Sequence, residues 1–233
     1  EISSWGWEWK YGSRLPQLLL VVCEAAPDVR IRLGSLEPRT IDEEFCTMLS
    51  GCKNLCPHFH LSLQSGSDTV LKRMNRKYDT ARYLESVRLL HKHFPNCAVT
   101  TDLIVGFPGE TEQEFSDSLS FMQTCRLAAV HVFPYSRRKG TPAASMPDQI
   151  EKSEKERRAA LAGEVAAELH QTFLTQQIGT EHDVLFEQTE NGYFTGHTMN
   201  YVKVYCDAAD LRNEIRRVRV TSLFEDGVLA ELV

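Results

Sequence analysis

Small and polar residues follow four β-rich runs in the first part of the chain, and these are the positions where chemistry is expected. They occupy residues 34–38, 64–68, 106–110 and 134–141. Glycine in such segments lets the backbone approach a flat ligand closely. Ligands of parallel α/β domains bind at the carboxyl ends of the strands. Tight turns alone would account for any one segment, but four in succession predict a ligand-binding face.

Asp102 lies inside the otherwise apolar run of residues 98–105. A carboxylate in a buried strand must be paired or hydrogen-bonded, so it has either a ligand or a structural network as its partner. Gly106 and Gly109 follow directly in a loop that matches no phosphate-binding or dinucleotide-binding fingerprint. The loop therefore predicts close approach to a flat ligand without naming it.

Two basic clusters flank these segments, one at residues 72–77 and one at residues 137–139. Residues 1–150 as a whole are balanced, with 17 basic and 17 acidic side chains. The clusters would therefore create local positive potential beside the expected ligand face. A phosphate-bearing substrate or an anionic polymer is the natural partner of such a surface.

The elements that position these residues follow from hydrophobic periodicity. Strands are predicted at residues 29–33, 58–63, 98–105 and 129–133, and helices at 41–49, 81–93 and 111–125. This alternation indicates a parallel sheet, either doubly wound or closed into a barrel. A charged helix is predicted from Asp148 to Gln177, ended by Gly179. Five strands then predict a small OB-like barrel, at residues 182–187, 193–197, 201–206, 215–221 and 228–233.

Composition narrows the class of protein. No apolar run reaches the roughly eighteen residues of a membrane span, and the start resembles no signal peptide. Seven scattered cysteines favour a reducing cytoplasm over a disulfide framework. The formal net charge is −6, and residues 178–233 hold 5 basic and 10 acidic side chains, so RNA contacts in the last module would be local. The candidates there are Tyr201, Lys203, Arg217 and Arg219.

Four runs in order resemble the radical-SAM methylthiotransferase family: RIRLGSLEP, HLSLQSGSDTVLKRMNRKY, TTDLIVGFPGET and VFPYSRRKGTPAA. The stretch GTEHDVLFEQTENGYFTGHTMNYVKV resembles the TRAM domain of that family, an OB-like RNA-binding module. The SLEP, LQSGSD and NGY…GHTMNY details most resemble the branch that modifies N6-threonylcarbamoyladenosine in tRNA. They are less similar to the branches that act on isopentenyladenosine or on a ribosomal-protein aspartate.

This resemblance implies an α/β fold with the last four strands of a six-stranded radical-SAM barrel, followed by an OB-like TRAM domain. The implied domains are residues 1–147, a connecting helix at 148–178, and 179–233. The implied activity is addition of a methylthio group to C2 of the modified adenosine beside the anticodon. S-adenosylmethionine and tRNA are the implied partners, with the sulfur donor open and two [4Fe-4S] clusters in the full-length enzyme. A non-catalytic RNA-binding protein is the alternative from another class.

The resemblance also assigns residues. S-adenosylmethionine would contact Gln64, Ser65, Arg76, Asp102, Ile104, Gly106, Gly109, Glu110 and Phe133. The substrate base or the tRNA backbone would contact Ser35, Glu37, Lys72, Arg73 and Arg138, with Arg76 and Arg138 interchangeable between the two ligands.

One departure from the family pattern matters. The sequence contains no CxxxCxxC motif, and Cys52 and Cys56 lack a third cysteine after them. We therefore expect no metal ligands in this chain and no cluster binding or activity by this chain alone. Residues 1–4 are expected to end the second barrel strand.

Overall fold

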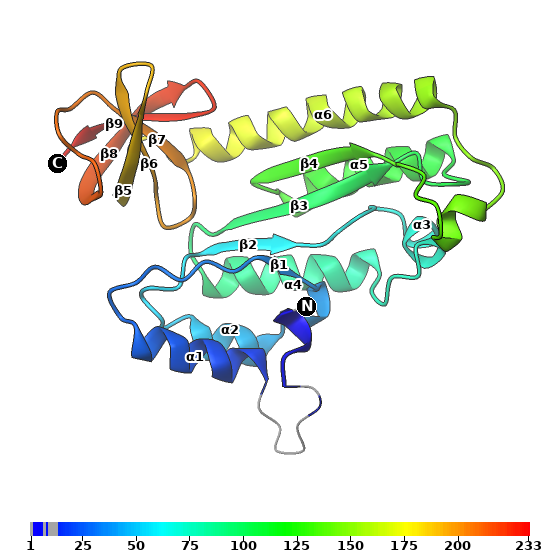
Figure 1. Cartoon of the computed structure of the whole chain (residues 1–233), viewed down its shortest axis with the longest axis horizontal. Coiled ribbons are helices and arrows are strands. Elements are labelled where there is room, and N and C mark those ends of the chain that lie inside the picture. Colours follow the sequence, from blue (N-terminus) through cyan, green and yellow to red (C-terminus); the bar gives the residue numbers. More distant parts are fainter. Residues whose placement is uncertain (1, 7, 9–13) are drawn as a thin grey trace.

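The computed structural model describes residues 2–6, 8 and 14–233 (Figure 1). Its larger part is a four-stranded parallel sheet in the order β1 (Ser35–Leu36), β2 (His58–Leu61), β3 (Ala98–Val105) and β4 (Ala129–Pro134). Ser35 pairs with His60, His60 with Thr100, and Thr100 with Ala129, so one row of residues crosses all four strands. The strands predicted at 98–105 and 129–133 are confirmed, and the strand predicted at 58–63 is confirmed over residues 58–61.

The two faces of this sheet differ, because successive strand residues point to opposite sides. Phe59, Leu61, Val99, Leu103 and Val105 are buried in one hydrophobic core with the helices. The alternate residues form what we call the open face. Polar side chains predominate at its end nearest the small barrel. The open face is composed of Ser35, His58, His60, Thr100, Asp102, Ile104, Ala129, His131 and Phe133.

Helices cover the apolar face. They are α1 (Leu15–Ala25), α2 (Glu43–Leu49), α3 (Asp68–Arg73), α4 (Thr80–His93) and α5 (Glu112–Cys125). Asp42 caps α2, Asp79 caps α4, and Thr111 forms a capping box with Glu114 at α5. Each cap satisfies backbone N–H groups that the first helical turn leaves free. Thr111 is thereby the N-cap of α5, at the residue where the helix predicted at 111–125 begins.

Helix α6 (Lys152–Thr175) joins the two parts of the molecule and lies along β4 (Figure 1). Ala162 and Ala166 pack into the core of the sheet, whereas Leu174 belongs to the core of the second part. The sequence of this helix is rich in charged residues, but in the structure the helix is amphipathic and its small residues pack against the sheet.

The second part is a closed barrel of five strands in the order β5-β6-β7-β9-β8. Its strands are β5 (Glu181–Glu190), β6 (Tyr193–His197), β7 (Lys203–Cys206), β8 (Glu214–Phe224) and β9 (Gly227–Leu232). Val184, Phe186, Val204, Val220 and Val228 are among the buried residues that fill it. The predicted five strands are confirmed. In Figure 1 the barrel lies at the end of the sheet where β2, β3 and β4 begin.

The strand predicted at residues 29–33 is wrong. Only Ile31 pairs there, through an isolated bridge to Leu55, and the ladder starts at Ser35. The Ile31–Leu55 bridge is one residue out of register with the Ser35–His60 pair, and Pro57, which lies between them on the partner segment, has no N–H to donate to a ladder. The short helices α1 and α3, together with η2 (Pro38–Thr40), were not predicted.

The expectation for residues 1–4 is also wrong where the structure describes it. Ile2–Ser4 forms the 3-10 helix η1 instead of a strand end, and Glu1 lies outside the described residues. Four Cys side chains are buried in the hydrophobic core of the sheet and helices: Cys23, Cys46, Cys97 and Cys125.

Candidate functional site

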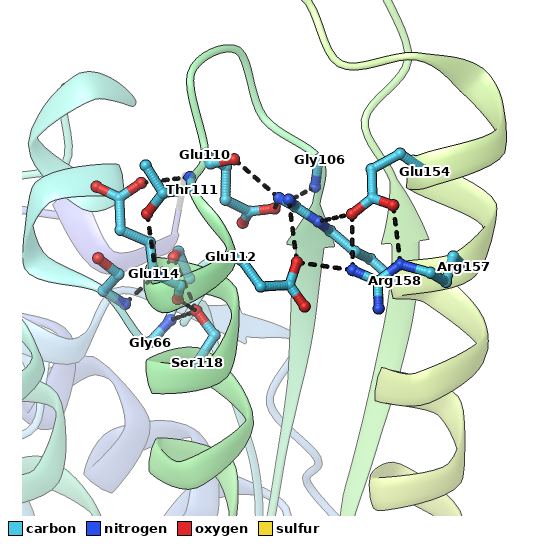
Figure 2. A network of polar contacts seen from close by, with 12 residues as sticks. Gly66, Gly106, Glu110, Thr111, Glu112, Glu114, Ser118, Glu154, Arg157 and Arg158 are labelled. Atoms are coloured by element: carbon cyan, nitrogen blue, oxygen red, sulfur yellow. Dashed lines mark hydrogen bonds and ion pairs between the residues drawn. The ribbon is translucent and has the colours of Figure 1, made fainter.

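The glycine-rich loop after β3 is closed by a buried carboxylate. Glu110 accepts a hydrogen bond of 2.6 Å from the Gly106 N–H and one of 2.7 Å from Arg158 Nη1. The side chains of Glu110 and Arg158 are only 1% and 5% exposed. Figure 2 shows Arg158 reaching from α6 to the loop. The loop is thus held in one shape by a residue far along the chain.

The charge of this pair is balanced within the fold. Burial raises the pKa of Glu110, while Arg158 and the Gly106 N–H oppose that rise. Arg158 also donates to Glu154 at 2.7 Å and to the Glu110 carbonyl at 2.9 Å. A buried carboxylate with such partners anchors structure, so the side chain of Glu110 is engaged by the loop and by α6.

Gly106 has a positive φ of +71°. A Cβ on this residue would lie 2.3 Å from Lys155 Cγ, whose ammonium group donates to the Tyr135 carbonyl at 3.1 Å. The side of Gly106 that a side chain would fill therefore faces α6. Gly109 also has a positive φ, +73°, but its nearest neighbour is Arg73 Nε at 3.9 Å. The space beside Gly109 that a side chain would fill is therefore open.

The loop after β2 is fastened to β3 and to α5. The Gln64 N–H donates to the Asp102 carbonyl, and the Ile104 N–H donates to the Gln64 carbonyl, each at 2.9 Å. Ser65 is fully buried with its hydroxyl 3.3 Å from the Ser118 hydroxyl. The backbone of Gln64 thus extends the sheet, and the side chain of Ser65 packs the loop onto α5.

The basic cluster at residues 72–77, at the end of α3, contains side chains with and without an ion-pair partner. Both Nη atoms of Arg73 donate to the Glu114 carboxylate, at 2.9 and 2.7 Å. This hydrogen bonding lowers the pKa of Glu114 to about 2. Within residues 14–233, Lys72 and Arg76 are exposed and form no ion pair, and the same is true of Arg138 after β4. These three cations are available to an anionic ligand.

The open face of the sheet carries a cluster of polar side chains. His60 Nδ1 lies 3.0 Å from the Thr100 hydroxyl, and His60 Nε2 lies 3.5 Å from an Asp102 carboxylate oxygen. Asp102 is the partner of His131 in the ladder with β4. The side chain of Asp102 is 34% exposed. The predicted pairing of Asp102 thus exists, and the partner is an imidazole that faces the same side.

Beyond this cluster the open face becomes apolar. Ile104 pairs with Phe133 in the ladder, and Phe133 is 51% exposed. We call these two residues the apolar shelf. It lies at the carboxyl ends of β3 and β4, directly before the glycine loop, where a flat ring could pack. Glu37, expected near the substrate, is bound by Arg39 with two contacts of 3.1 Å.

At the end of the open face away from the apolar shelf, a pocket of about 400 Å³ lies between the sheet and the small barrel. We call it the junction pocket. Its lining includes Arg32, Ser35, His58, His60, Thr100, His131, Asn200 and Tyr201. Tyr201 stacks on His197 with ring centres 4.5 Å apart, and its ring is 5.1 Å from that of His58. Burial lowers the pKa of His58 to about 4. His58 is therefore neutral at pH 7.

The basic residues predicted in the small barrel are matched by carboxylates. Lys203 lies 2.9 Å from Glu190 and 3.0 Å from Asp226. Arg219 lies 2.6 Å from Glu181, and Arg217 lies 3.4 Å from the same residue. Each of these three cations already has an acidic partner, so their positive potential is reduced.

The structure brings Asp102, Ile104 and Phe133 together with the glycine loop, and it places Ser35 and Tyr201 at the junction pocket. Sequence reasoning missed His60 and His131, although the alternation in HFHLSL and AVHVF puts both on one face. It also missed Arg158 and Arg32, for which no local signal exists.

Within residues 2–6, 8 and 14–233, no three or more His, Cys, Asp or Glu side chains are placed to hold a metal ion. In the same residues, no helix combines the length and the apolar character that crossing a membrane requires.

Residues 1–122 match the model of the radical SAM superfamily. The chain is 37% identical over 220 residues to a Thermotoga maritima protein named threonylcarbamoyladenosine tRNA methylthiotransferase MtaB, covering 94% of this chain and 50% of the relative. It is 42% identical over 176 residues to an Alkaliphilus oremlandii protein named tRNA-2-methylthio-N(6)-dimethylallyladenosine synthase, covering 72% and 36%.

Among solved structures, coproporphyrinogen III oxidase (HemN) from Escherichia coli superposes with a TM-score of 0.53 at 16% identity, covering 88% of this chain and 48% of that one. This likeness concerns the fold alone. The chain spans about half the length of the curated relatives it matches. A matching superfamily model over half of the chain, together with relatives that are tRNA methylthiotransferases, shows that the chain belongs to the radical-SAM methylthiotransferase family.

Proposed function

We propose that this chain is the S-adenosylmethionine-side and RNA-binding part of a tRNA methylthiotransferase that acts on N6-threonylcarbamoyladenosine. The observation that carries the proposal is the open face, where an apolar shelf beside a glycine loop is followed by a pocket next to the small barrel that holds polar side chains among apolar ones. Both a cofactor ring and a modified base can lie on one continuous surface there.

The residues present fit S-adenosylmethionine. The apolar shelf of Ile104 and Phe133 would pack against the adenine ring, and the backbone of the loop at Gly109 would lie at its edge. Gln64 and Asp102 would lie near the ribose, and Arg76 would serve the methionine carboxylate. When bound, the cofactor supplies radical chemistry that acid–base side chains cannot supply.

The chain's own residues would bind and orient. Glu110 and Arg158 keep the loop in place, so the shelf presents a fixed surface to the ring. Asp102 supplies an acceptor on the open face between the shelf and the pocket, and His60, which lies 3.5 Å from it, lines the pocket. Preorganised groups of this kind position a reacting carbon without further rearrangement.

The substrate branch is supported by the motifs and by the chemistry of the pocket. Relatives in the comparison are named for either threonylcarbamoyladenosine or dimethylallyladenosine. The junction pocket has an apolar wall, and arginine, imidazole and hydroxyl groups stand among its lining. A threonylcarbamoyl group offers polar partners to such a lining, whereas a dimethylallyl group offers none.

For the RNA, the small barrel would act as an OB-like TRAM module. Lys72, Arg76 and Arg138 would contact phosphates, because none of them has a carboxylate partner in the described residues. Lys203, Arg217 and Arg219 would contribute less, since each is paired. Phosphate contacts set the position of the RNA and its affinity.

Mass spectrometry of tRNA nucleosides tests the function. Deleting the gene should remove the methylthio form of threonylcarbamoyladenosine and leave that of isopentenyladenosine. Loss of the latter mark alone would overturn the substrate assignment. Binding of S-adenosylmethionine to the purified chain, weakened by a Phe133→Asp change, tests the shelf separately by calorimetry.

A further inference from the structure

Among the described residues, Arg32 is a cation of the junction pocket without a carboxylate partner. Its guanidinium carbon lies 4.1 Å from the centre of the Tyr201 ring, and within residues 14–233 Arg32 forms no ion pair. The side chain is exposed and lines the pocket. A guanidinium group that rests on a ring face keeps its N–H edge free for a planar anion.

The remainder of the pocket lining leaves this charge uncompensated. Asp226 is the acidic residue of the lining, and it is bound by Lys203 at 3.0 Å and by the Tyr205 hydroxyl at 2.5 Å. Most other polar groups in the lining are imidazoles, hydroxyls and an amide. An anion that enters the pocket therefore meets one unpaired positive charge and several hydrogen-bonding groups.

The tyrosine under Arg32 is itself held in place. His197 of β6 stacks on Tyr201 with an interplanar angle of 13°, and His197 Nδ1 lies 2.9 Å from Glu187. Arg30, two residues before Arg32, donates to the carbonyls of His197 and Asp183, each at 2.9 Å. The segment that carries Arg32 is thus fastened to the barrel, which fixes where the guanidinium group points.

Arg32 lies where the N6 substituent of a modified base on the open face could reach it. Pocket and apolar shelf share one face, separated along β3 by the four residue steps from Thr100 to Ile104, about 13 Å at the usual rise of a strand. A base that lies between them can direct one edge toward the shelf and its N6 substituent toward the pocket. The threonylcarbamoyl substituent ends in a carboxylate, whereas a dimethylallyl substituent is apolar.

We propose that Arg32, supported by Tyr201, binds the carboxylate of the threonylcarbamoyl group and so distinguishes this substrate from adenosines with an uncharged N6 substituent. The inference rests on the proposed function and assigns a specificity role to residues in the junction pocket. Charge-assisted, two-pronged binding of a carboxylate by arginine supplies both affinity and direction.

Binding of anticodon stem-loop RNAs to the chain of residues 1–233 tests this role. Three RNAs are compared that differ only at the modified position: threonylcarbamoyladenosine, its methyl ester, and isopentenyladenosine. For the unaltered chain, the free carboxylate should bind about 10-fold or more tighter than the ester. Arg32→Ala should bring the ratio of the two dissociation constants close to 1, and Arg32→Lys should retain part of it.

Arg88→Ala is the matched control, because Arg88 is an exposed arginine on α4 that also lacks an ion pair in the described residues. Its ratio should equal that of the unaltered chain. Arg32→Ala that weakens all three RNAs equally would overturn the proposal and leave the proposed function intact, since Arg32 would then be a phosphate contact. An equal affinity of the unaltered chain for acid and ester would also overturn it. Absence of binding to every stem-loop would count against the proposed function itself.

Discussion

Arg158 of α6 and Glu110 of the glycine loop meet at 2.7 Å with both side chains almost completely buried. Because the partners come from a connecting helix and from the loop after β3, this contact makes the shape of the loop depend on where α6 packs. The Gly106 N–H shares the same carboxylate. The loop, the helix and the sheet are therefore one unit.

Replacing Arg158 should strongly destabilise the folded chain. Arg158→Ala leaves the Glu110 carboxylate buried without its cation, and breaking a buried pair in this way costs about 3–5 kcal/mol of unfolding free energy. Urea denaturation of the chain measures the loss. The control is Arg157→Ala, on the same helix but exposed and paired with Glu112 and Glu154, which should leave the midpoint almost unchanged. Equal effects of the two changes would contradict a special role for the buried pair.

Gly106→Ala should destabilise through two separable effects. The positive φ of Gly106 costs a residue with a side chain about 1–2 kcal/mol, and the new Cβ would also press on the stem of Lys155. Adding Lys155→Ala should remove only the second effect. Comparing Gly106→Ala in both backgrounds by urea denaturation separates them. A Gly106→Ala chain as stable as the original would show that the loop does not need this backbone conformation.

His58 should make the chain sensitive to mild acid. Its pKa in the folded chain is about 4, below the ordinary value of 6.5, so protonation favours the unfolded chain. The stability associated with neutral His58 is present above pH 6.5 and is lost as the pH falls toward 4, by up to about 3 kcal/mol. His58→Phe, which keeps a ring beside Tyr201, should lack this loss.

Unfolding free energies measured between pH 7 and 4.5 for the two chains give the comparison. His91 and His182, whose pKa values are also lowered by burial, are present in both and contribute equally. The difference between the two curves should therefore report His58 alone. Parallel curves over this range would contradict the prediction.

Salt dependence should rank the cations that contact RNA. Lys72→Ala and Arg138→Ala should each reduce the slope of log affinity against log salt by about 0.7–0.9, as expected for one lost phosphate contact. Arg219→Ala should change the slope less, because Arg219 is paired with Glu181 at 2.6 Å. Filter binding of tRNA at several salt concentrations measures the slopes. An equal change at Arg219 would mean that its ion pair opens on binding.

The sequence by itself determined most strands, the glycine loop and the five-stranded barrel. Each of these depends on local signals: alternation in AVTTDLIV, turn residues such as Asn191 and Gly192, and a capping box at Thr111. It also assigned Ser35, Asp102, Ile104 and Phe133 to an expected ligand face, and that assignment stays a prediction. Parallel strands deliver their carboxyl ends to one edge, so chain order was enough for that inference.

Only the tertiary structure decided which charged groups are available. Arg73 and Glu110 look like ligand contacts in sequence, but Glu114 and Arg158 engage them after folding. Arg32, in a run that reads as a strand, instead lies over Tyr201 of the distant small barrel. These contacts join segments that are far apart in the sequence, and they depend on how α6 and the small barrel pack against the sheet. Packing between remote segments leaves no periodic signal in the sequence of either segment.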